Sequence, residues 1–430
     1  MHRSPVSSRS FQLLNAKHGQ SLHHLSYYDM SVPCLPPSAL PSNLESLECR
    51  SVDSGEALGR LVHANKNSLR CLKIGEEKAL VDRYYRLRTG FYDSIPQPLQ
   101  AMQSVTSLAD LPKLRHLSLV GLDLKPLVPE EVEDALYLTN LQELTLESCL
   151  GSTEFLAAMT SIFSFAQSDA VSQPKPAPKL EKFLFRHEAS TAALRDGLLQ
   201  FLNSFSGLRM LSLLFENGSM SLRLAALAPN HGQTLEQLVL ESRIQPRENL
   251  RLDTSRPFGI GGYTQQLWEE GTDDICRLCP NLSELSIGFP WNDEMVRIRQ
   301  SPLPKLMSLR TMHIRNFPES NNLIQMGDYS IKEHAHKFLE WTFCDITGGE
   351  KPKLETLSIG PSIYESRFKG SNPARRQAPE FLRTHHFMVD WAQTRFGRWS
   401  AMVTPVSEKY MEEIRGEKPL GGVFQQVWLR

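Results

Sequence analysis

A pattern of six residues with fixed apolar positions recurs along most of the chain. It reads Leu-x-x-Φ-x-Φ, where Φ is apolar, and eleven copies follow one another over about residues 11–360. Because side chains of a strand alternate between its two faces, the fourth and sixth positions place two apolar side chains on one face. The pattern therefore predicts a short strand at every copy. The copies begin at Leu22, Leu44, Leu69, Leu114, Leu141, Leu180, Leu208, Leu235, Leu282, Leu309 and Leu354.

The segments between the copies are long enough to return the chain for parallel pairing, which requires a crossover. Apolar residues at helical spacing predict crossover helices over Gly55–Asn65, Thr191–Phe205 and Ser330–Phe343. One such strand cannot bury its apolar face alone, whereas stacked copies bury one continuous core. We therefore expect an α/β solenoid with a parallel sheet on its concave side and helices outside.

The residues that lead into the strands also recur. Pro-Lys-Leu or Pro-Asn-Leu occurs four times, and proline marks the end of a crossover helix because it cannot continue a helix interior. His18-Gly-Gln-Ser-Leu22 and His231-Gly-Gln-Thr-Leu235 are near copies of a second exit. In this exit we expect the glycine to cap the helix C-terminus.

Four crossovers exceed the usual repeat length of about 20–29 residues. They lie near residues 75–111, 166–178, 243–272 and 315–350, and none contains a second clean copy of the pattern. We expect long, irregular crossovers there, with a polar insertion at 166–178.

The two ends of the chain differ from the repeats. Residues 1–10 form a polar start, and the chain then enters a crossover helix, so the first strand, Leu22–Tyr27, is expected to present an open edge to an upstream module or a partner. Residues 361–430 hold three of the six tryptophans and are expected to form an aromatic C-terminal cap. Helices are expected in this cap over Phe381–Phe396 and Glu408–Ile414.

Composition narrows the class of protein. Lys+Arg 47 against Asp+Glu 48 gives a formal charge of -1, which argues against nucleic-acid binding as the main task. The sequence has no apolar stretch long enough for a transmembrane helix, so no membrane association is expected. Seven cysteines, an odd number, indicate a reducing, intracellular location in the cytoplasm or nucleus. Residues 1–28 lack Asp and Glu, which leaves mitochondrial targeting as a minor alternative.

Motifs that carry catalytic or metal chemistry are weak in this sequence. Cys276-Arg-Leu-Cys279 has no second pair of ligands at zinc-finger spacing, so core packing is the preferred interpretation. His334 and His336 stand two residues apart in an expected helix and point to different faces. No phosphate loop or nucleophile motif is present. We expect no cofactor, no metal and no enzyme activity.

The third and fifth positions of each copy point away from the core and form the candidate binding surface. Ten steps of about 4.8 Å give a concave surface on the order of 50 Å long, which suits a protein partner better than a small molecule. The candidate partner-binding residues on it are His116, Ser118, Glu143, Thr145, Lys182, Gln237, Glu284, Ser286, Thr311 and His313.

The recurring pattern resembles the leucine-rich repeat family, whose consensus is L-x-x-L-x-L-x-x-N/C-x-L. In the ninth position only Cys149 fits the family, so irregular turns are expected. The resemblance implies a horseshoe-shaped solenoid. The long crossovers also look like those of fungal F-box/leucine-rich repeat proteins, in which an F-box binds the adaptor of a cullin ubiquitin ligase.

This second resemblance implies a non-enzymatic substrate-recognition subunit, although no F-box-like segment precedes the first copy. The alternative is a free-standing repeat scaffold without a ubiquitin role. An enzyme ranks last.

Overall fold

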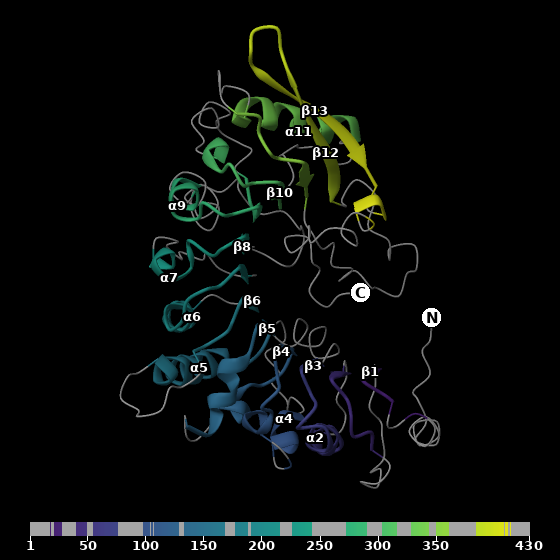
Figure 1. Cartoon of the computed structure of the whole chain (residues 1–430), viewed down its shortest axis with the longest axis vertical. Coiled ribbons are helices and arrows are strands. Elements are labelled where there is room, and N and C mark those ends of the chain that lie inside the picture. The colour runs from purple at the N-terminus through teal and green to yellow at the C-terminus, as the bar shows by residue number, and fades with distance from the viewer. Residues whose placement is uncertain are drawn as a thin grey trace, which may run out of the picture. The chain divides into compact units, whose positions relative to one another are not determined.

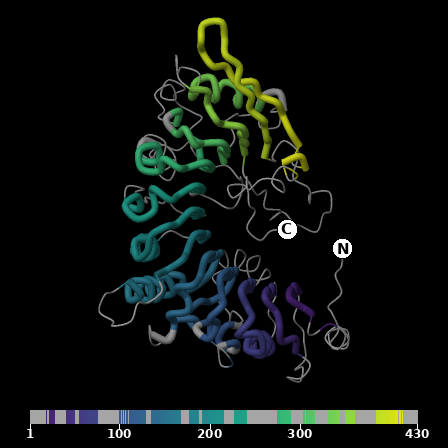
Figure 2. The backbone as a smooth tube through the Cα atoms, in the orientation of Figure 1, coloured from purple at the N-terminus to yellow at the C-terminus, as the bar shows by residue number. Residues whose placement is uncertain are grey.

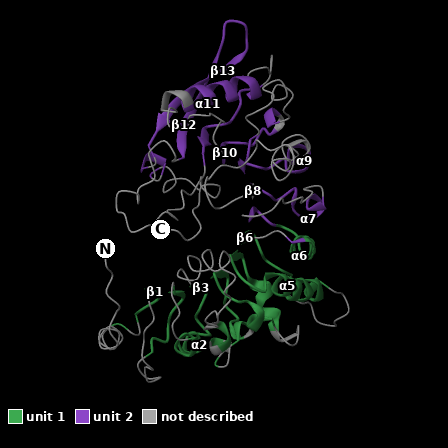
Figure 3. Ribbon diagram, turned by 180° about the vertical axis from the view of Figure 1, so that it is seen from behind, with its two compact units in different colours: residues 1–187, 192–207 green, residues 188–191, 208–430 purple. Residues whose placement is uncertain are grey.

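The computed structural model describes most of the repeat region and part of the C-terminal region. The chain falls into two compact units, residues 1–187 with 192–207 and residues 188–191 with 208–430 (Figure 3). The residues described are 18, 21–27, 40–49, 55–75, 98–103, 105, 107–128, 133–167, 177–187, 191–215, 226–242, 272–289, 303–315, 328–343, 350–360, 384–407, 409–411 and 413.

The described part of the first unit alternates strands with helices, and neighbouring strands pair in parallel in the order of the chain. Its strands are β1 (His24–Tyr27), β2 (Ser46–Cys49), β3 (Cys71–Gly75), β4 (His116–Val120), β5 (Glu143–Glu147) and β6 (Lys182–His187). Its helices are α2 (Gly55–Ala64), α4 (Pro98–Gln103), α5 (Ser152–Gln167) and α6 (Ala192–Asn203), with 3-10 turns η2 (Leu108–Asp110), η3 (Lys125–Leu127) and η4 (Glu133–Asn140). Helices α5 and α6 lie on one side of strands β4 to β6 (Figure 1).

The second unit begins with parallel strands and ends with an antiparallel hairpin (Figure 2). Its strands are β7 (Met210–Phe215), β8 (Gln237–Ser242), β9 (Glu284–Ile287), β10 (Thr311–Ile314), β11 (Thr356–Ile359), β12 (His385–Gln393) and β13 (Trp399–Val406). Its helical segments are α7 (Ala228–His231), α9 (Thr272–Leu278), α11 (Asp328–Phe343) and the turn η7 (Leu303–Lys305). The expected mixed α/β fold with a mostly parallel sheet is therefore confirmed.

Each strand from β1 to β11 begins at the third position of a hexad, as the six-residue pattern predicts. The register aligns equivalent positions, for example Leu117 with Leu144 and Leu119 with Leu146. From β2 to β11 the fourth and sixth positions are buried. The first repeat differs, because Leu25 is only half-buried.

Main-chain hydrogen bonds at the strand starts hold this register. The carbonyl of Arg70, a second-position residue, accepts the N–H groups of Arg115 at 2.8 Å and His116 at 3.0 Å. The same arrangement joins Glu236 to Ser283 and Glu284 in the second unit, at 2.9 and 3.0 Å. Each repeat thus satisfies two N–H groups of the next one, and a slip by one residue would turn every apolar side chain out of the core.

The three crossover helices expected from apolar spacing are present as α2, α6 and α11. In α6 the buried residues Leu194, Leu198, Phe201 and Leu202 follow the three- and four-residue spacing of one helical face. Phe201 packs against Phe163 of α5 with ring centroids 5.6 Å apart. This packing joins neighbouring crossovers into one layer.

The C-terminal region corrects the expected helix over Phe381–Phe396. Its described part forms the antiparallel hairpin of β12 and β13, because Phe387, Val389 and Trp391 are buried at every second residue. Trp391 packs against Phe343 of α11 with ring centroids 5.9 Å apart, and its indole N–H donates to the Leu354 carbonyl at 2.8 Å. Residues 409–411 are helical, in agreement with the second expected helix, and Trp428 lies outside the described residues.

Gly232 is the C-cap residue of α7, as expected, and its N–H donates to the Ala228 carbonyl at 2.9 Å. Its φ of -55° is right-handed, so this cap does not require the left-handed conformation. A Cβ at this position would lie 2.3 Å from the Leu278 carbonyl oxygen. The glycine is required by the close approach of the segment at the end of α9.

The long crossovers are described only in part. The described residues of 75–111 contain α4 and η2, and those of 315–350 contain α11, with no further strand in either. Most of 166–178 and 243–272, and all of 1–10, lie outside the described residues. No described helix is both long and apolar enough to cross a membrane.

Candidate functional site: the polar face of the strands

The third and fifth hexad positions form the polar face, which lies opposite the apolar core. In the first unit the register brings the third positions of five neighbouring strands into one row. This row consists of Ser46, Cys71, His116, Glu143 and Lys182. Lys182 is exposed and the other four are half-buried, so the row is accessible to a partner.

Glu143 is the electrostatic centre of this row. Its Oε2 lies 3.4 Å from Nδ1 of His116 on the neighbouring strand. The hydrogen bond from His116 lowers the pKa of Glu143, and the charges of Lys182 and Lys73 act in the same direction, while burial opposes them. The carboxylate is therefore held ionised among positive groups.

Cys71, in the same row, is not set up as a nucleophile. Burial raises the pKa of its thiol more than the hydrogen bond with Ser46 and the charge of Lys73 lower it. The protonated thiol is a weak nucleophile, so this residue contributes shape and a weak polar contact instead.

The fifth positions of the first unit are less accessible than the sequence suggests. Ser118 is 6% exposed and Thr145 is 4% exposed. Beyond them, at the ends of β5 and β6, Arg186 donates to Glu147 at 2.8 Å, and both side chains are buried. These residues belong to the interior of the unit and rigidify the edge of the accessible row.

In the second unit the polar face is largely interior. Gln237 is half-buried and donates to Glu284 at 3.1 Å, but Glu284 itself is 1% exposed. Ser286, Thr311 and His313 are also buried. The expectation of one open surface along all eleven strands is thus corrected, because six of the ten candidate residues are buried: Ser118, Thr145, Glu284, Ser286, Thr311 and His313.

A fifth-position row in the second unit forms buried polar contacts. Arg315 donates to the Ser286 hydroxyl at 3.1 Å, and Nε2 of His313 lies 2.6 Å from the Gly360 carbonyl. The Ser358 hydroxyl lies 2.6 Å from Nδ1 of His386. These contacts satisfy polar groups that would be costly to bury unpaired.

The C-terminal segment contributes to this burial. Val239, the fifth position of β8, belongs to one hydrophobic cluster with Met411, and Val406 packs against that cluster. A fifth-position residue of the repeats thus shares a core with residues that follow the repeats. Met411 and Val406, which follow the repeats, therefore help to cover the polar face at Val239.

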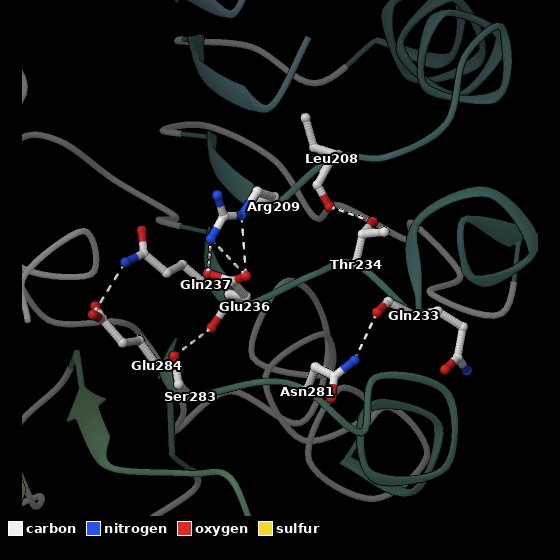
Figure 4. A network of polar contacts seen from close by, with 9 residues as sticks. All are labelled: Leu208, Arg209, Gln233, Thr234, Glu236, Gln237, Asn281, Ser283 and Glu284. Carbon is white, nitrogen blue, oxygen red and sulfur yellow. Dashed lines mark hydrogen bonds and ion pairs between the residues drawn. The ribbon is translucent and has the colours of Figure 1, made fainter. Parts of the chain in front are cut away.

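The second hexad position, which is not among the predicted site positions, carries exposed ion pairs along the starts of the strands. Arg209 binds Glu236 through three hydrogen bonds of 2.8 to 3.0 Å, as Figure 4 shows. Arg310 donates to Glu355 at 3.0 Å. The signal that could have indicated them is an Arg followed by a Glu at the second positions of consecutive hexads, as at Arg209 with Glu236 and Arg310 with Glu355.

At two of the described repeats, two side chains hold the peptide groups of the leading leucine of the preceding hexad, and we call this arrangement the peptide clamp. Asn65 Oδ1 accepts the N–H of Leu44 at 2.8 Å, and the Ser68 hydroxyl donates to the carbonyl of the same Leu44 at 2.8 Å. In the second unit, Nδ1 of His231 accepts the Leu208 N–H at 3.3 Å. Thr234 donates to the Leu208 carbonyl at 2.8 Å, as Figure 4 shows. The clamp residues stand four and one positions before a leading leucine.

Metal and redox chemistry find no support at Cys276 and Cys279. Burial raises the pKa of Cys279 to about 11, with Asp274 adding to the shift, so its thiolate is disfavoured. Both cysteines are free, and the described residues contain no group of three or more His, Cys, Asp or Glu placed to hold a metal ion. His336 pairs with Glu340 at 3.5 Å on the surface of α11.

Comparison with protein-family models gives no match for the chain, and comparison with curated protein sequences gives none either.

Proposed function

We propose that this chain is a leucine-rich repeat protein that acts without catalysis by binding another protein on the polar face of its first unit. The single observation that carries the proposal is the accessible third-position row, with Glu143 ionised among His116, Lys73 and Lys182. Charged and polar side chains of both signs in one row favour a complementary protein surface over a small molecule.

The row is also the right kind of scaffold for recognition. Its side chains stand on adjacent parallel strands whose register is held by paired main-chain hydrogen bonds. A site on strands keeps its geometry better than one on loops, so little ordering cost is added on binding. Ser46 and Lys182 are four strands apart, which is a span of about 19 Å.

Within this function, a substrate-recognition subunit of a cullin-type ubiquitin ligase is the preferred role. Its support is the resemblance of the repeat region and its long crossovers to F-box/leucine-rich repeat proteins. The same face would serve a free-standing scaffold equally well. The presence or absence of the ligase adaptor among the bound proteins separates the two roles.

An enzyme remains the least favoured class. The Ser358–His386 hydrogen bond is the described contact that comes nearest to an activated nucleophile. Ser358 is 0% exposed, so a substrate carbonyl does not reach its hydroxyl in this conformation. The contact is better explained as the pairing of buried polar groups.

The test is affinity purification from cells followed by mass spectrometry, with the wild-type chain and a double variant, Lys73→Glu and Lys182→Glu. We expect the principal bound protein to be lost from the variant, because one substitution reverses the charge of Lys182 in the row and the other reverses that of Lys73, which also acts on Glu143. Lys113→Glu, an exposed lysine that precedes β4 and lies outside the row, is the matched control and should retain the partner. Equal recovery with both variants would refute the assignment of the binding face.

Cullin-adaptor peptides in the wild-type sample would support the ligase role. Their absence, with another partner retained, would support the scaffold.

A further inference from the structure

The N-terminal edge of the first unit carries a third copy of the peptide clamp. Ser21 stands one position before the leading Leu22, and His18 stands four positions before it, as Thr234 and His231 do before Leu235. The local geometry is also shared: the Ser21 N–H and hydroxyl both approach the His18 carbonyl, at 2.9 and 3.2 Å. Thr234 makes the same two contacts with the His231 carbonyl, at 3.0 and 3.1 Å.

The two filled clamps hold the leading leucine of the preceding strand, but the clamp of His18 and Ser21 holds no described segment. Both side chains are exposed. In both filled clamps the N–H of the leading leucine donates to the first clamp residue, which is Asn65 or His231. The carbonyl of the same leucine accepts from the hydroxyl of the second clamp residue, Ser68 or Thr234. A residue bound by His18 and Ser21 would make the same two hydrogen bonds.

Strand β1 follows this clamp directly. Among the described strands it pairs with β2 alone, so its other edge has no described neighbour. Its carbonyl at His23 accepts the N–H groups of Glu45 and Ser46, at 2.8 and 3.0 Å. By the same rule, the N–H groups of His23 and His24 are the ones that a preceding strand would satisfy, and they have no partner among the described residues.

The apolar side of β1 is incomplete as well. Leu22, Leu25 and Tyr27, the first, fourth and sixth positions of its hexad, are all half-buried. The equivalent positions of the next repeat, Leu44, Leu47 and Cys49, are all 0% exposed. The leucines of one more hexad would complete the burial of the first.

We propose that the edge of β1 that no described strand covers, with His18 and Ser21, binds a strand of another protein that carries the same Leu-x-x-Φ-x-Φ pattern and adds parallel to β1. The clamp receives the peptide group of the leading leucine, and the main-chain ladder receives the rest of the strand. Main-chain hydrogen bonds supply affinity in such strand addition, and the leucine positions supply specificity. This surface is separate from the polar face, so the proposal stands or falls independently of the proposed function.

The probe is a labelled synthetic peptide with the sequence of residues 40–49, because its Leu44 is the residue held by the filled clamp of Asn65 and Ser68. Binding to the full chain is followed by fluorescence polarisation. We expect saturable binding, and we expect His18→Ala and Ser21→Ala each to weaken it about tenfold through the loss of one hydrogen bond.

Two further comparisons separate the clamp from a loss of fold. His18→Asn should retain binding, because the amide oxygen of Asn65 already performs this role in the second repeat. A peptide N-methylated at Leu44 should bind the wild-type chain about tenfold more weakly than the unmethylated peptide. The affinity of the methylated peptide should not fall further in the His18→Ala variant, because the methyl group and the substitution remove the same hydrogen bond.

His63→Ala, an exposed histidine at the end of α2 outside any clamp, should bind as the wild type does. Absence of binding to the wild type, or equal binding of the methylated and unmethylated peptides, would overturn the proposal.

Discussion

The polar faces of the two units are built by the same hexad but have opposite environments. In the first unit the third positions from β2 to β6 are half-buried or exposed, whereas Glu284, Thr311 and Thr356 of β9 to β11 are at most 4% exposed. The hexad therefore determines which side chains share a face, because that follows from strand alternation alone. Whether the face is open depends on residues outside the hexads, such as Met411 in the cluster with Val239.

The largest expected effect concerns two ion pairs whose burial is opposite to that of the polar faces: the pair in the first unit is buried and the pair in the second unit is exposed. Arg186 and Glu147 are buried in the first unit, with side chains 10% and 1% exposed. Arg186→Met should lower the free energy of unfolding by about 3–5 kcal/mol, because it leaves a buried carboxylate without its cation. The measurement is urea unfolding of the full chain.

The matched control is Arg209→Met in the second unit, which removes the cation of the exposed pair with Glu236. Its side chain is 55% exposed, so the expected loss is below about 1 kcal/mol. Similar losses for the two variants would show that the burial of the Arg186 pair has no energetic consequence.

The second prediction tests the closed polar face directly. Thr311→Asp places a carboxyl group at a position that is 1% exposed and in register with Glu284. The loss of stability should be about 2–4 kcal/mol, because the group has to be buried either charged next to a carboxyl or protonated. The midpoint of urea unfolding and its slope give this value.

His24→Asp is the corresponding substitution at an exposed third position in the first unit. We expect a change within about 0.5 kcal/mol, as for most surface substitutions. If Thr311→Asp were equally mild, the polar face of the second unit would be open in solution and the contrast between the units would disappear.

These contrasts also show what the sequence can and cannot reveal. The strands were predictable because their signal is local: Leu114, Leu117 and Leu119 lie within six residues, and the same spacing recurs. The sequence does not predict the hairpin of β12 and β13, because this region contains no hexad and the spacing of its apolar residues is also compatible with a helix. The clamp contact between Asn65 and Leu44 spans 21 residues and joins a side chain to the backbone, so no apolar pattern marks it.

The burial of the candidate residues could not be predicted for a related reason. A Thr or Ser in the fifth position predicts a polar, exposed side chain, yet Thr145 and Ser286 are 4% and 0% exposed. Small hydroxyl groups can be buried when they find partners, as Ser286 does with Arg315. The charged and longer side chains of the first-unit row, such as Lys182 and Glu143, were the more reliable indicators of accessibility.

The smallest effect should come from the accessible row itself, at Glu143. The pKa of Glu143 is lowered from 4.5, first by the hydrogen bond from His116 and then by the charge of Lys182. A carboxyl whose pKa is lower in the folded state stabilises the fold above pH 4.5, and this contribution is lost as the pH falls through the folded-state value. Since the side chain is 33% exposed, Glu143→Gln should cost less than about 1 kcal/mol at pH 7.

The difference between wild type and Glu143→Gln should therefore shrink as urea unfolding is repeated from pH 7 down to about pH 4 and below. In a His116→Ala background the substitution should cost less at pH 7, because the largest cause of the pKa shift has been removed. A difference that grew toward low pH would mean that the folded state favours the protonated carboxyl, and the row would then lack the ionised centre on which partner recognition depends.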